Sequence, residues 1–389
     1  MNDTAHITGW AHTPFGKLPQ EDVETLMAEV TGKAIADAGL EPGEIDAVKV
    51  GVFNNGFSSQ GFEAALIGAG DPALANIPAT HLENACATGS AALFGALDMI
   101  EAGRAKAVLV VGAEKMTAIP GAEVNNILLS GSHRKTEQSA GSFAGVFGQL
   151  ADLYNDRYGD PREAMAHVAA KNHRNGVDNP YAHMRKDLGY DFCAVESENN
   201  PYVVGRLLRT DCSMVSDGAA AVIVTNADVA RSARRSVAIR GRAQANDHLA
   251  LDARRDPLEF AGAQTAFFGA LEDASIKLND LDLLETHDCF TIAEVLQYEA
   301  FGIAKPGKAL EVLAAGKTNP DGNLPVNRSG GLKAKGHPLG ATGVSQHVLA
   351  AMQLTGEAGA MQLNNANHAA VFNMGGTAVA NYATVLEAV

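Results

Sequence analysis

The chain lacks several features that would place it in common protein classes. Its four cysteines lie far apart and form no Cys-x-x-Cys pair, which argues against a zinc site or a redox dithiol of that type. Positive charge is scarce, because 30 Lys and Arg face 45 Asp and Glu, for a formal net charge of -15. An acidic chain disfavours nucleic acid or an anionic membrane as its main partner.

Targeting and membrane signals are also missing. The N-terminus, MNDTAHITGW, has no basic segment followed by an apolar run, so we expect no secretory signal. The longest apolar runs, such as Ala107–Ala113, are far too short to span a bilayer. Widely spaced cysteines in a chain without a signal are typical of free thiols in a reducing compartment. We therefore expect a cytoplasmic protein that contacts neither membrane nor nucleic acid.

Phosphate-binding loops are absent, although one segment comes close. The segment GGLKAKGHPLGATG, Gly330–Gly343, combines glycines and lysines before a helical pattern. From Gly331 its spacing reaches Gly336, but His337 follows where a P-loop requires Lys. No Gly-x-Gly-x-x-Gly follows a strand pattern either. The glycines are better explained by a close approach of the backbone to another part of the chain and by a tightly packed helix.

The chain repeats itself weakly in two places. The segments DAGLEPGEID from Asp37 and DASIKLNDLD from Asp273 share three identical positions, and each predicts a helix, a loop and a strand near Val48 or Leu283. A second pair, Ala87-Thr88-Gly89 and Ala341-Thr342-Gly343, precedes a helix of small residues in each half. Two repeats in the same order predict a duplicated α/β unit. The alternative is a similarity of composition alone. The apolar strand patterns that follow lie at Ala107–Val111 and Ala370–Met374.

The region 117–204 differs from both repeats. It is richer in Asn, His, Arg, Tyr and Pro and has few long apolar runs. We predict one clear helix in it, near Phe147–Tyr158, and a return to the core with a strand at Ala219–Thr225. A polar insertion between two core elements is a typical place for a segment that covers a ligand.

Cys86 is the first candidate for chemistry. It follows a strand pattern and opens a helix, where unpaired N–H groups and the partial positive charge favour a thiolate. We therefore predict a lowered pKa for this thiol, with N–H donors for an oxyanion close by. The alternative is an inert buried cysteine, the commonest fate of a free cysteine.

Two histidines and a second cysteine lie at similar junctions. His337 stands between Gly336 and Pro338 just before a helix, where it could act as a base to a nearby thiol. His287 and Cys289 end a predicted strand, before a helical pattern at Ile292–Ala300, and residues two apart on a strand face the same side. Each histidine alone could be structural. Three such junctions in one chain favour a functional site.

Other candidates carry less weight. Cys212 lies beside a turn and a strand and is interpreted as structural, and Cys193 has no base near it in sequence. His173 and His183 lack metal-ligand spacing and are interpreted as solvated or structural. Two interpretations stay open for Lys333 and Lys335, namely solvated positions or distant contacts with a phosphate. We predict no metal site and no permanently bound cofactor.

At these motifs the chain resembles the thiolase superfamily, and more narrowly the thiolases related to sterol carrier protein x. NACATGSAAL is similar to the nucleophile motif, KGHPLGATG to the Gly-His-Pro motif, and HDCF to the variant block of that subgroup. NMGG, from Asn373 to Gly376, stands where most thiolases carry Cys-x-Gly. The resemblance implies a five-layer αβαβα sandwich of two duplicated halves, 1–235 and 236–389, with a loop domain inserted in the first at about 117–204.

The resemblance also implies roles for the candidate residues. Cys86 would be the acylated nucleophile and His337 the base that activates it. Cys289 would be the second acid and base, since Asn373 replaces the usual cysteine. His287 would supply one oxyanion hole, with His337 also holding the enolate oxygen. The backbone N–H groups of Cys86 and Gly375 would supply the other oxyanion hole.

The implied activity is a reversible condensation of two acyl-CoA molecules, or the CoA-dependent cleavage of a 3-oxoacyl-CoA, through an acyl-cysteine. Coenzyme A and its thioesters would be substrates, and the candidates for contacts with CoA are the inserted region and the loop around Ala261–Phe268. The family implies a homodimer or homotetramer. The alternatives are a condensing subunit or acyltransferase that works with a small zinc-ribbon partner, and a non-catalytic scaffold.

Overall fold

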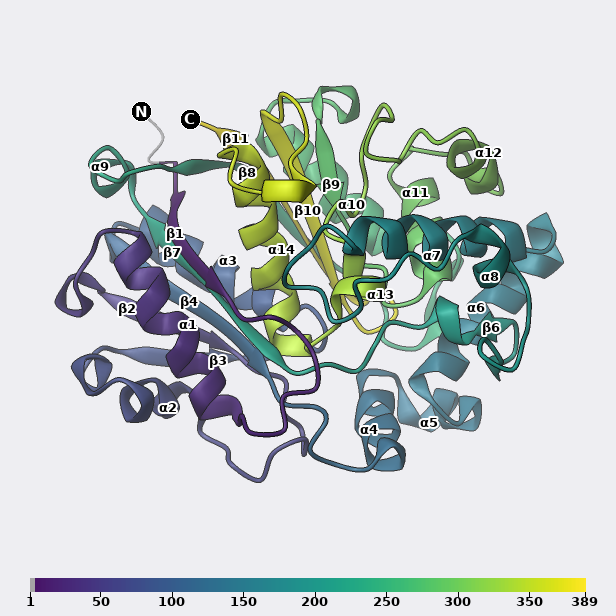
Figure 1. Ribbon diagram of the computed structural model, residues 1–389, viewed down its shortest axis with the longest axis horizontal. Helices are drawn as coiled ribbons and strands as arrows, with labels where there is room; N and C mark the ends of the chain where they lie inside the picture. Colours follow the sequence, from purple (N-terminus) through teal and green to yellow (C-terminus); the bar gives the residue numbers. More distant parts are fainter. Residues whose placement is uncertain (1–3) are drawn as a thin grey trace.

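The computed structural model describes residues 4–389 and packs helices on both faces of one large sheet (Figure 1). The strands are β1 (His6–His12), β2 (Ala47–Gly51), β3 (Ala79–Leu82), β4 (Ala107–Glu114), β5 (Tyr202–Val204), β6 (Leu207–Leu208), β7 (Gly218–Thr225), β8 (Val237–Asn246), β9 (Leu283–Glu285), β10 (His368–Gly375) and β11 (Ala380–Ala388). The helices are α1 (Val23–Asp37), α2 (Glu63–Gly70), α3 (Thr88–Glu101), α4 (Gly121–Leu128), α5 (Arg134–Glu137), α6 (Phe143–Tyr158), α7 (Arg162–Gly176), α8 (Tyr190–Ala194), α9 (Ala227–Ala230), α10 (Ala261–Asp273), α11 (Thr291–Ala300), α12 (Ala309–Ala314), α13 (Gly331–Lys335) and α14 (Leu339–Leu354).

Local sequence explains the main elements. The segment AVLVVGAE forms β4, a strand whose residues are all buried, as expected for an apolar run with sheet neighbours on both sides and helices above and below. Asp22 caps α1, since its side chain accepts a hydrogen bond from the N–H of Thr25 at 2.8 Å. The predicted strands near Val48 and Leu283 and the predicted helix near Phe147–Tyr158 are confirmed.

The sheet topology contains the same four-stranded order twice. The nine strands run in the order β3-β2-β4-β7-β1-β8-β11-β10-β9. In the first half β2 is parallel to β4, and β7 is antiparallel to both β4 and β1. In the second half β9 is parallel to β10, and β11 is antiparallel to both β10 and β8. The series β2-β4-β7-β1 therefore corresponds to β9-β10-β11-β8, and the predicted duplication is confirmed.

The two halves meet along a short seam in the sheet and a helical layer between them. Two register pairs join β1 to β8, His6 with Ala238 and Ile7 with Val237. The helices α3 and α14 pack on each other and on strands of both halves (Figure 1). On the outer faces, α1 and α2 cover the first half, and α10 and α11 cover the second. The layer of α3 and α14 thus lies between the two halves of the sheet, with helices on the outer face of each half. These are the five layers of the expected αβαβα arrangement.

The segment between β4 and β7 holds α4 to α8 and the hairpin of β5 and β6. Its helix α6 packs on α11 of the second half, with Phe147 stacked on Phe290 at 4.5 Å between ring centroids. This segment therefore reaches across to the second half. The domain limits of 1–235, 236–389 and about 117–204 stay predictions.

Two expectations from the sequence need correction. The stretch Ala261–Phe268 is not a loop but the first part of helix α10, whose buried face packs on β8 and β11. His287 and Cys289 do not lie on a strand, because β9 ends at Glu285, so strand alternation does not explain their common location. Within residues 4–389, no helix has both the length and the apolar character that a bilayer crossing requires.

Candidate active site

A cavity of about 150 Å³ opens where the two halves and the inserted segment meet. Cys86 from the first half and Cys289 and His337 from the second half line this cavity together. The remaining wall is largely apolar and includes inserted residues. Those are Asn125, Leu128, Phe143, Ala144 and Val203. The inserted segment thus covers the cavity, as the sequence led us to expect.

Cys86 sits on a tight turn at the start of α3. Ala85 has a φ of 50°, a left-handed conformation that costs a non-glycine residue about 1 kcal/mol. The hydroxyl of Thr88 donates to the carbonyl of Ala85 at 2.6 Å and accepts from the N–H of Asn84 at 2.8 Å. These contacts hold the turn in its strained form, so that the Cys86 side chain points away from the helix toward the cavity.

The pKa of Cys86 is raised, although its place at a helix N-terminus predicted a lowered pKa. Burial raises the pKa of this thiol to about 12, and the nearby charges of Glu114 and Glu83 raise it further. Hydrogen bonds from the backbone N–H groups of Gly376 and of Cys86 itself offset part of that rise. A fully buried sulfur loses more from desolvation than it gains from the helix, so this thiol needs a proton acceptor to become a nucleophile.

The N–H group that reaches the Cys86 sulfur belongs to Gly376, one residue beyond the predicted Gly375. Gly375 ends β10, and a side chain there would meet the carbonyl of Asn84 at 2.4 Å, so the backbone can approach the loop before Cys86 only with glycine. The role of the Gly375 N–H toward a substrate oxygen stays a prediction.

His337 lies in the loop between α13 and α14. Its Nδ1 is 2.7 Å from Oγ1 of Thr342, and that hydroxyl donates to the carbonyl of Pro338 at 2.8 Å. Burial and the charge of Lys335 lower the pKa of His337 to about 3. The imidazole is therefore neutral at physiological pH, as a proton acceptor must be.

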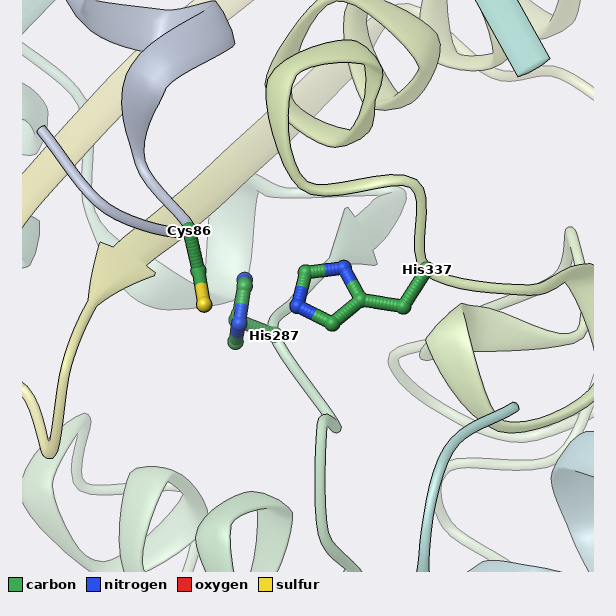
Figure 2. Close-up of side chains that lie close together, drawn as sticks. All are labelled: Cys86, His287 and His337. Carbon is green, nitrogen blue, oxygen red and sulfur yellow. The ribbon is translucent and has the colours of Figure 1, made fainter. Parts of the chain in front are cut away.

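His287 stands between Cys86 and His337 (Figure 2). The two imidazole rings meet edge to face, with centroids 5.0 Å apart. One potential ligand atom from each of Cys86, His287 and His337 lies within 4.8 Å of the others. Burial lowers the pKa of His287 well below its usual range, with smaller effects of His337 and Lys335. His287 is 50 positions from His337 and 201 positions from Cys86 in the sequence. The duplicated fold brings these three side chains together.

Cys289 lines the same cavity as Cys86 and His337. Its carbonyl accepts from the N–H of Ser213 at 2.9 Å, which ties the loop to the segment before β7. Burial raises the pKa of this thiol well above its usual range, and the charge of Cys86 raises it further. A thiol with such a pKa is a strong base once it has lost its proton.

A resident metal fits this group poorly. Within residues 4–389, Cys86, His287 and His337 are the group whose ligand atoms lie close enough to share an ion. A metal-bound histidine donates its second ring N–H to an acceptor. Thr342 offers that acceptor to His337, but the atom facing Nδ1 of His287 is the amide nitrogen of Asn373, at 2.9 Å. The environment suits proton transfer better than metal binding.

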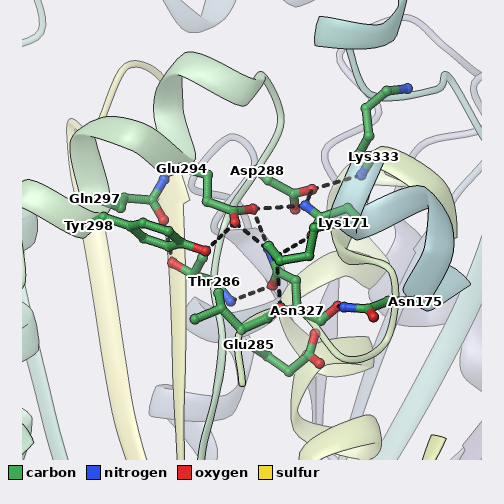
Figure 3. A network of polar contacts seen from close by, with 12 residues as sticks. Lys171, Asn175, Glu285, Thr286, Asp288, Glu294, Gln297, Tyr298, Asn327 and Lys333 are labelled. Atoms are coloured by element: carbon green, nitrogen blue, oxygen red, sulfur yellow. Dashed lines mark hydrogen bonds and ion pairs between the residues drawn. The ribbon is translucent and has the colours of Figure 1, made fainter. Parts of the chain in front are cut away.

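Asp288 is a positioning residue that sequence reasoning missed. Its carboxylate accepts the backbone N–H groups of Leu332, at 2.6 Å, and Lys333, at 3.1 Å, and so fixes α13 just before His337 (Figure 3). Asn172 from the inserted segment donates to Asp288 at 2.7 Å and to Glu294 at 2.8 Å. The aspartate of HDCF therefore ties the loop of His287 and Cys289 to the loop of His337.

The same network holds two further buried charges. Glu294 pairs with Lys171 at 3.1 Å and accepts from the hydroxyl of Tyr298 at 2.6 Å (Figure 3). Burial raises the pKa of Asp288, and the neighbouring Glu294 adds to that rise. No motif in the sequence predicted this network. The one indication of it was that Asp288 lies between the candidate residues His287 and Cys289.

The two lysines of the glycine-rich segment are not solvated. Lys333 is 3% exposed and Lys335 is fully buried, so the interpretation as solvated positions is wrong, while help with a phosphate from a distance stays a prediction. Burial lowers the pKa of both amines. Cys212 lines the cavity together with Cys289, and its structural interpretation stays a prediction. His173 is buried, and His183 bonds to Ser216 at 2.8 Å.

The glycines around His337 permit the close approach of the two halves. A side chain on Gly340 would meet the carbonyls of Ala113 at 2.4 Å and Gly51 at 2.5 Å. The N–H of Gly340 donates to the buried carboxylate of Glu114 at 2.9 Å. The expectation that these glycines serve packing against the nucleophile half is confirmed.

The fold and this cavity define a thiolase-like protein. A solved structure titled "Ltp2-ChsH2(DUF35) aldolase" superposes with a TM-score of 0.82 at 20% identity, covering 99% of this chain and 98% of that one. Human mitochondrial 3-ketoacyl-CoA thiolase, solved in complex with CoA, gives 0.74 at 18% identity, covering 100% and 98%.

Comparison of sequences gives the family. Residues 5–188 match the family model "Thiolase, N-terminal domain", and residues 243–388 match "Thiolase C-terminal domain-like". An acetyl-CoA acetyltransferase of Methanothermobacter thermautotrophicus is 37% identical over 381 residues, 97% of each chain. Sterol carrier protein 2 of Gallus gallus is 31% identical over 398 residues, 96% of this chain and 70% of its own length. The chain belongs to the thiolase family.

Proposed function

We propose that the protein is a thiolase-type acyltransferase, which condenses two acyl-CoA molecules or cleaves a 3-oxoacyl-CoA with CoA. The observation that carries this proposal is the meeting of Cys86, Cys289 and His337 in the wall of one largely apolar cavity. Two relatives of near full length, 37% and 35% identical to this chain, are acetyl-CoA acetyltransferases. Coenzyme A and its thioesters are the substrates.

The first half-reaction moves the acyl group to Cys86. Nε2 of the neutral His337 takes the thiol proton, and the sulfur attacks the thioester carbonyl. The bond to CoA breaks, and the CoA sulfur takes a proton from the thiol of Cys289. The products are acyl-Cys86, free CoA, an imidazolium at His337 and a thiolate at Cys289, whose opposite charges stabilise each other.

The second half-reaction forms the carbon–carbon bond. The Cys289 thiolate removes the α-proton of a second acyl-CoA, and the enolate carbon attacks the carbonyl of acyl-Cys86. Cys86 leaves as a thiolate and regains its proton from His337, so the cycle closes with every proton returned. Acyl-Cys86 cannot become a thiolate, so the negative charge on Cys86 that would raise the pKa of Cys289 cannot form while Cys289 acts as the base.

Oxyanions form in both half-reactions and need preorganised donors. The backbone N–H groups of Gly376 and of Cys86 itself reach the Cys86 sulfur, and we propose that N–H groups here, that of Gly375 included, stabilise the tetrahedral intermediate of acyl-Cys86. His287 and the imidazolium of His337 would hold the enolate oxygen, because the two rings lie side by side in the cluster with Cys86. Both sites are buried, so the charges that develop there interact strongly.

Acylation measured by intact mass tests the proposal. We expect an acetyl adduct on the wild-type chain after incubation with acetyl-CoA and none on Cys86→Ala, and thiolysis of a series of 3-oxoacyl-CoA chain lengths then defines the substrate. Absence of any adduct and of any thiolysis would overturn the enzyme assignment and favour the scaffold alternative.

The alternative of a condensing subunit with a small partner keeps the same cavity and chemistry. It differs in requiring a second polypeptide, such as a zinc-ribbon protein, for turnover. That requirement would be ruled out if the purified chain alone turned over substrate and light scattering showed it to be a homodimer or homotetramer. Acylation of Cys86 without turnover, restored by a partner, would support it.

A further inference from the structure

Asn373 connects the nucleophile to His287. It lies on β10 and is fully buried, as His287 is. Its amide nitrogen Nδ2 donates to the carbonyl of Cys86 at 3.1 Å and lies 2.9 Å from Nδ1 of His287. The two hydrogens of the amide are therefore both in use, one on each partner.

The orientation of this amide follows from its partners. If the amide were flipped, its oxygen would lie 3.1 Å from the carbonyl oxygen of Cys86, and two acceptors would face each other. Only the nitrogen satisfies that carbonyl. The group that faces Nδ1 of His287 is consequently an N–H donor, and Nδ1 must accept.

This contact fixes the tautomer of His287. A neutral imidazole that accepts at Nδ1 carries its proton on Nε2. Burial keeps the ring neutral by lowering its pKa. Nε2 has no hydrogen-bond partner within the described part of the chain, and a buried N–H without a partner costs about 1–3 kcal/mol. Such a donor suits a substrate oxygen that occupies the site during reaction.

His337 has the opposite tautomer. The single hydroxyl proton of Thr342 goes to the carbonyl of Pro338, so this hydroxyl accepts from Nδ1–H of His337. Nε2 of His337 then has a lone pair, and it too lacks a partner among residues 4–389. Two neutral rings 5.0 Å apart thus offer one donor and one acceptor to the same site.

We propose that Asn373 is a positioning residue, which holds His287 in the Nε2–H form so that the ring donates to the substrate's carbonyl oxygen as it becomes an enolate. The proposal deepens the proposed function and rests on it for the identity of that oxygen. It gives Asn373, which stands where the family's second catalytic cysteine is usually found, a role that requires no proton transfer of its own.

Nitrogen NMR of the full chain, labelled with ¹⁵N-histidine, tests the tautomer without any turnover. In the wild type, long-range ¹H–¹⁵N spectra are expected to show His287 protonated at Nε2 and His337 protonated at Nδ1, with the signals assigned from His287→Asn and His337→Asn. Asn373→Asp retains the size of the side chain but offers acceptors only, so His287 should gain a proton at Nδ1. An unchanged His287 signal in Asn373→Asp would overturn the proposal.

A double-mutant cycle tests how Asn373 acts on turnover. Asn373→Ala is expected to lower kcat for condensation by about 10-fold to 100-fold with little change in KM, the size of an oxyanion donor's contribution or somewhat less. The side-chain amide of the His287→Asn variant has no tautomer for Asn373 to fix. In that background, Asn373→Ala should therefore change kcat by a factor near one. Equal factors in both backgrounds would overturn the proposal, because Asn373 would then act through Cys86.

Asn381→Ala is the matched control. Asn381 is also fully buried, on β11, and its amide donates to the backbone carbonyls of Ala378 and Ala245 away from the cavity. It should leave the His287 signal and kcat unchanged. A chain that forms no acyl adduct in any background would refute the proposed function, while the NMR result on the tautomer would still stand or fall separately.

Discussion

Thr88 and Thr342 occupy equivalent positions in the two halves, and each holds a reactive residue through the same kind of contact. Thr88 donates its hydroxyl to the carbonyl of Ala85 at 2.6 Å and so supports the turn of Cys86. Thr342 donates to the carbonyl of Pro338 at 2.8 Å and accepts from the ring of His337. The duplicated Ala-Thr-Gly sequence therefore supplies the support for the proposed nucleophile in one half and for the proposed base in the other.

Thr342→Val should weaken the proposed base. Valine has the shape of threonine but cannot accept from Nδ1 of His337, so the ring is no longer held with its lone pair toward Cys86. We expect kcat/KM to fall by about 10² or more, within the usual contribution of a general base. Thr342→Ser keeps the hydroxyl and should retain most activity. Rates of Cys86 acylation, followed by stopped-flow release of CoA, measure both, and equal losses in Val and Ser would contradict this role.

Cys289→Ala should separate the two half-reactions. The variant keeps Cys86 and His337, so an acyl adduct should still form, although more slowly for lack of the proton that CoA receives. Removal of the α-proton should fall by about 10²–10⁴, the loss expected for a general base. Exchange of deuterium from solvent into the acetyl group of acetyl-CoA measures that step. Full exchange in Cys289→Ala would assign the base elsewhere, with Cys212 as the next cysteine on the cavity wall.

Asp288→Asn should destabilise the site and the fold together. The carboxylate of Asp288 accepts from Leu332, Lys333 and Asn172, and an amide would set one N–H group against these donors. The expected loss is about 1–3 kcal/mol in the free energy of unfolding, measured in urea. Asp228→Asn is the control, because it removes an exposed pair with Arg231 and should cost under about 0.5 kcal/mol. Equal losses in the two variants would contradict the positioning role of Asp288.

The sequence predicted the fold well because the duplication leaves two kinds of local signal. Helix and strand patterns recur in order, and the motifs around Cys86, His287 and His337 lie at junctions between them. Contacts between distant segments had no such signal. The pKa of Cys86 depends on how deeply the second half and the inserted segment bury the sulfur, which its helix position alone cannot indicate. The contact of Asn373 with His287 joins positions 86 residues apart, and no local pattern records it.

His347 should make the protein less stable in acid. It lies on α14, where Nδ1 is 2.7 Å from the carbonyl of Gly343 and Nε2 is 2.8 Å from the hydroxyl of Thr384. The first contact requires a proton on Nδ1, and burial lowers the pKa of this imidazole to about 4, below its ordinary 6.5. Between these two values the unfolded chain binds a proton that the folded chain does not, so stability is fully present above pH 6.5 and falls as the pH drops toward 4.

His347→Gln removes this titration, since glutamine binds no proton over that range. From pH 7 to pH 5 the wild type should lose about 2 kcal/mol more than the variant, because each unit of pKa difference corresponds to about 1.4 kcal/mol. At pH 7 the variant should be the less stable protein, having exchanged a well-packed ring for a flexible side chain, and the gap should narrow on acidification. Urea unfolding at several pH values between 5 and 8 measures both curves. Other buried histidines titrate equally in both proteins and cancel in the difference. Parallel curves would therefore mean that His347 has the same pKa in the folded and the unfolded chain, and they would contradict the prediction.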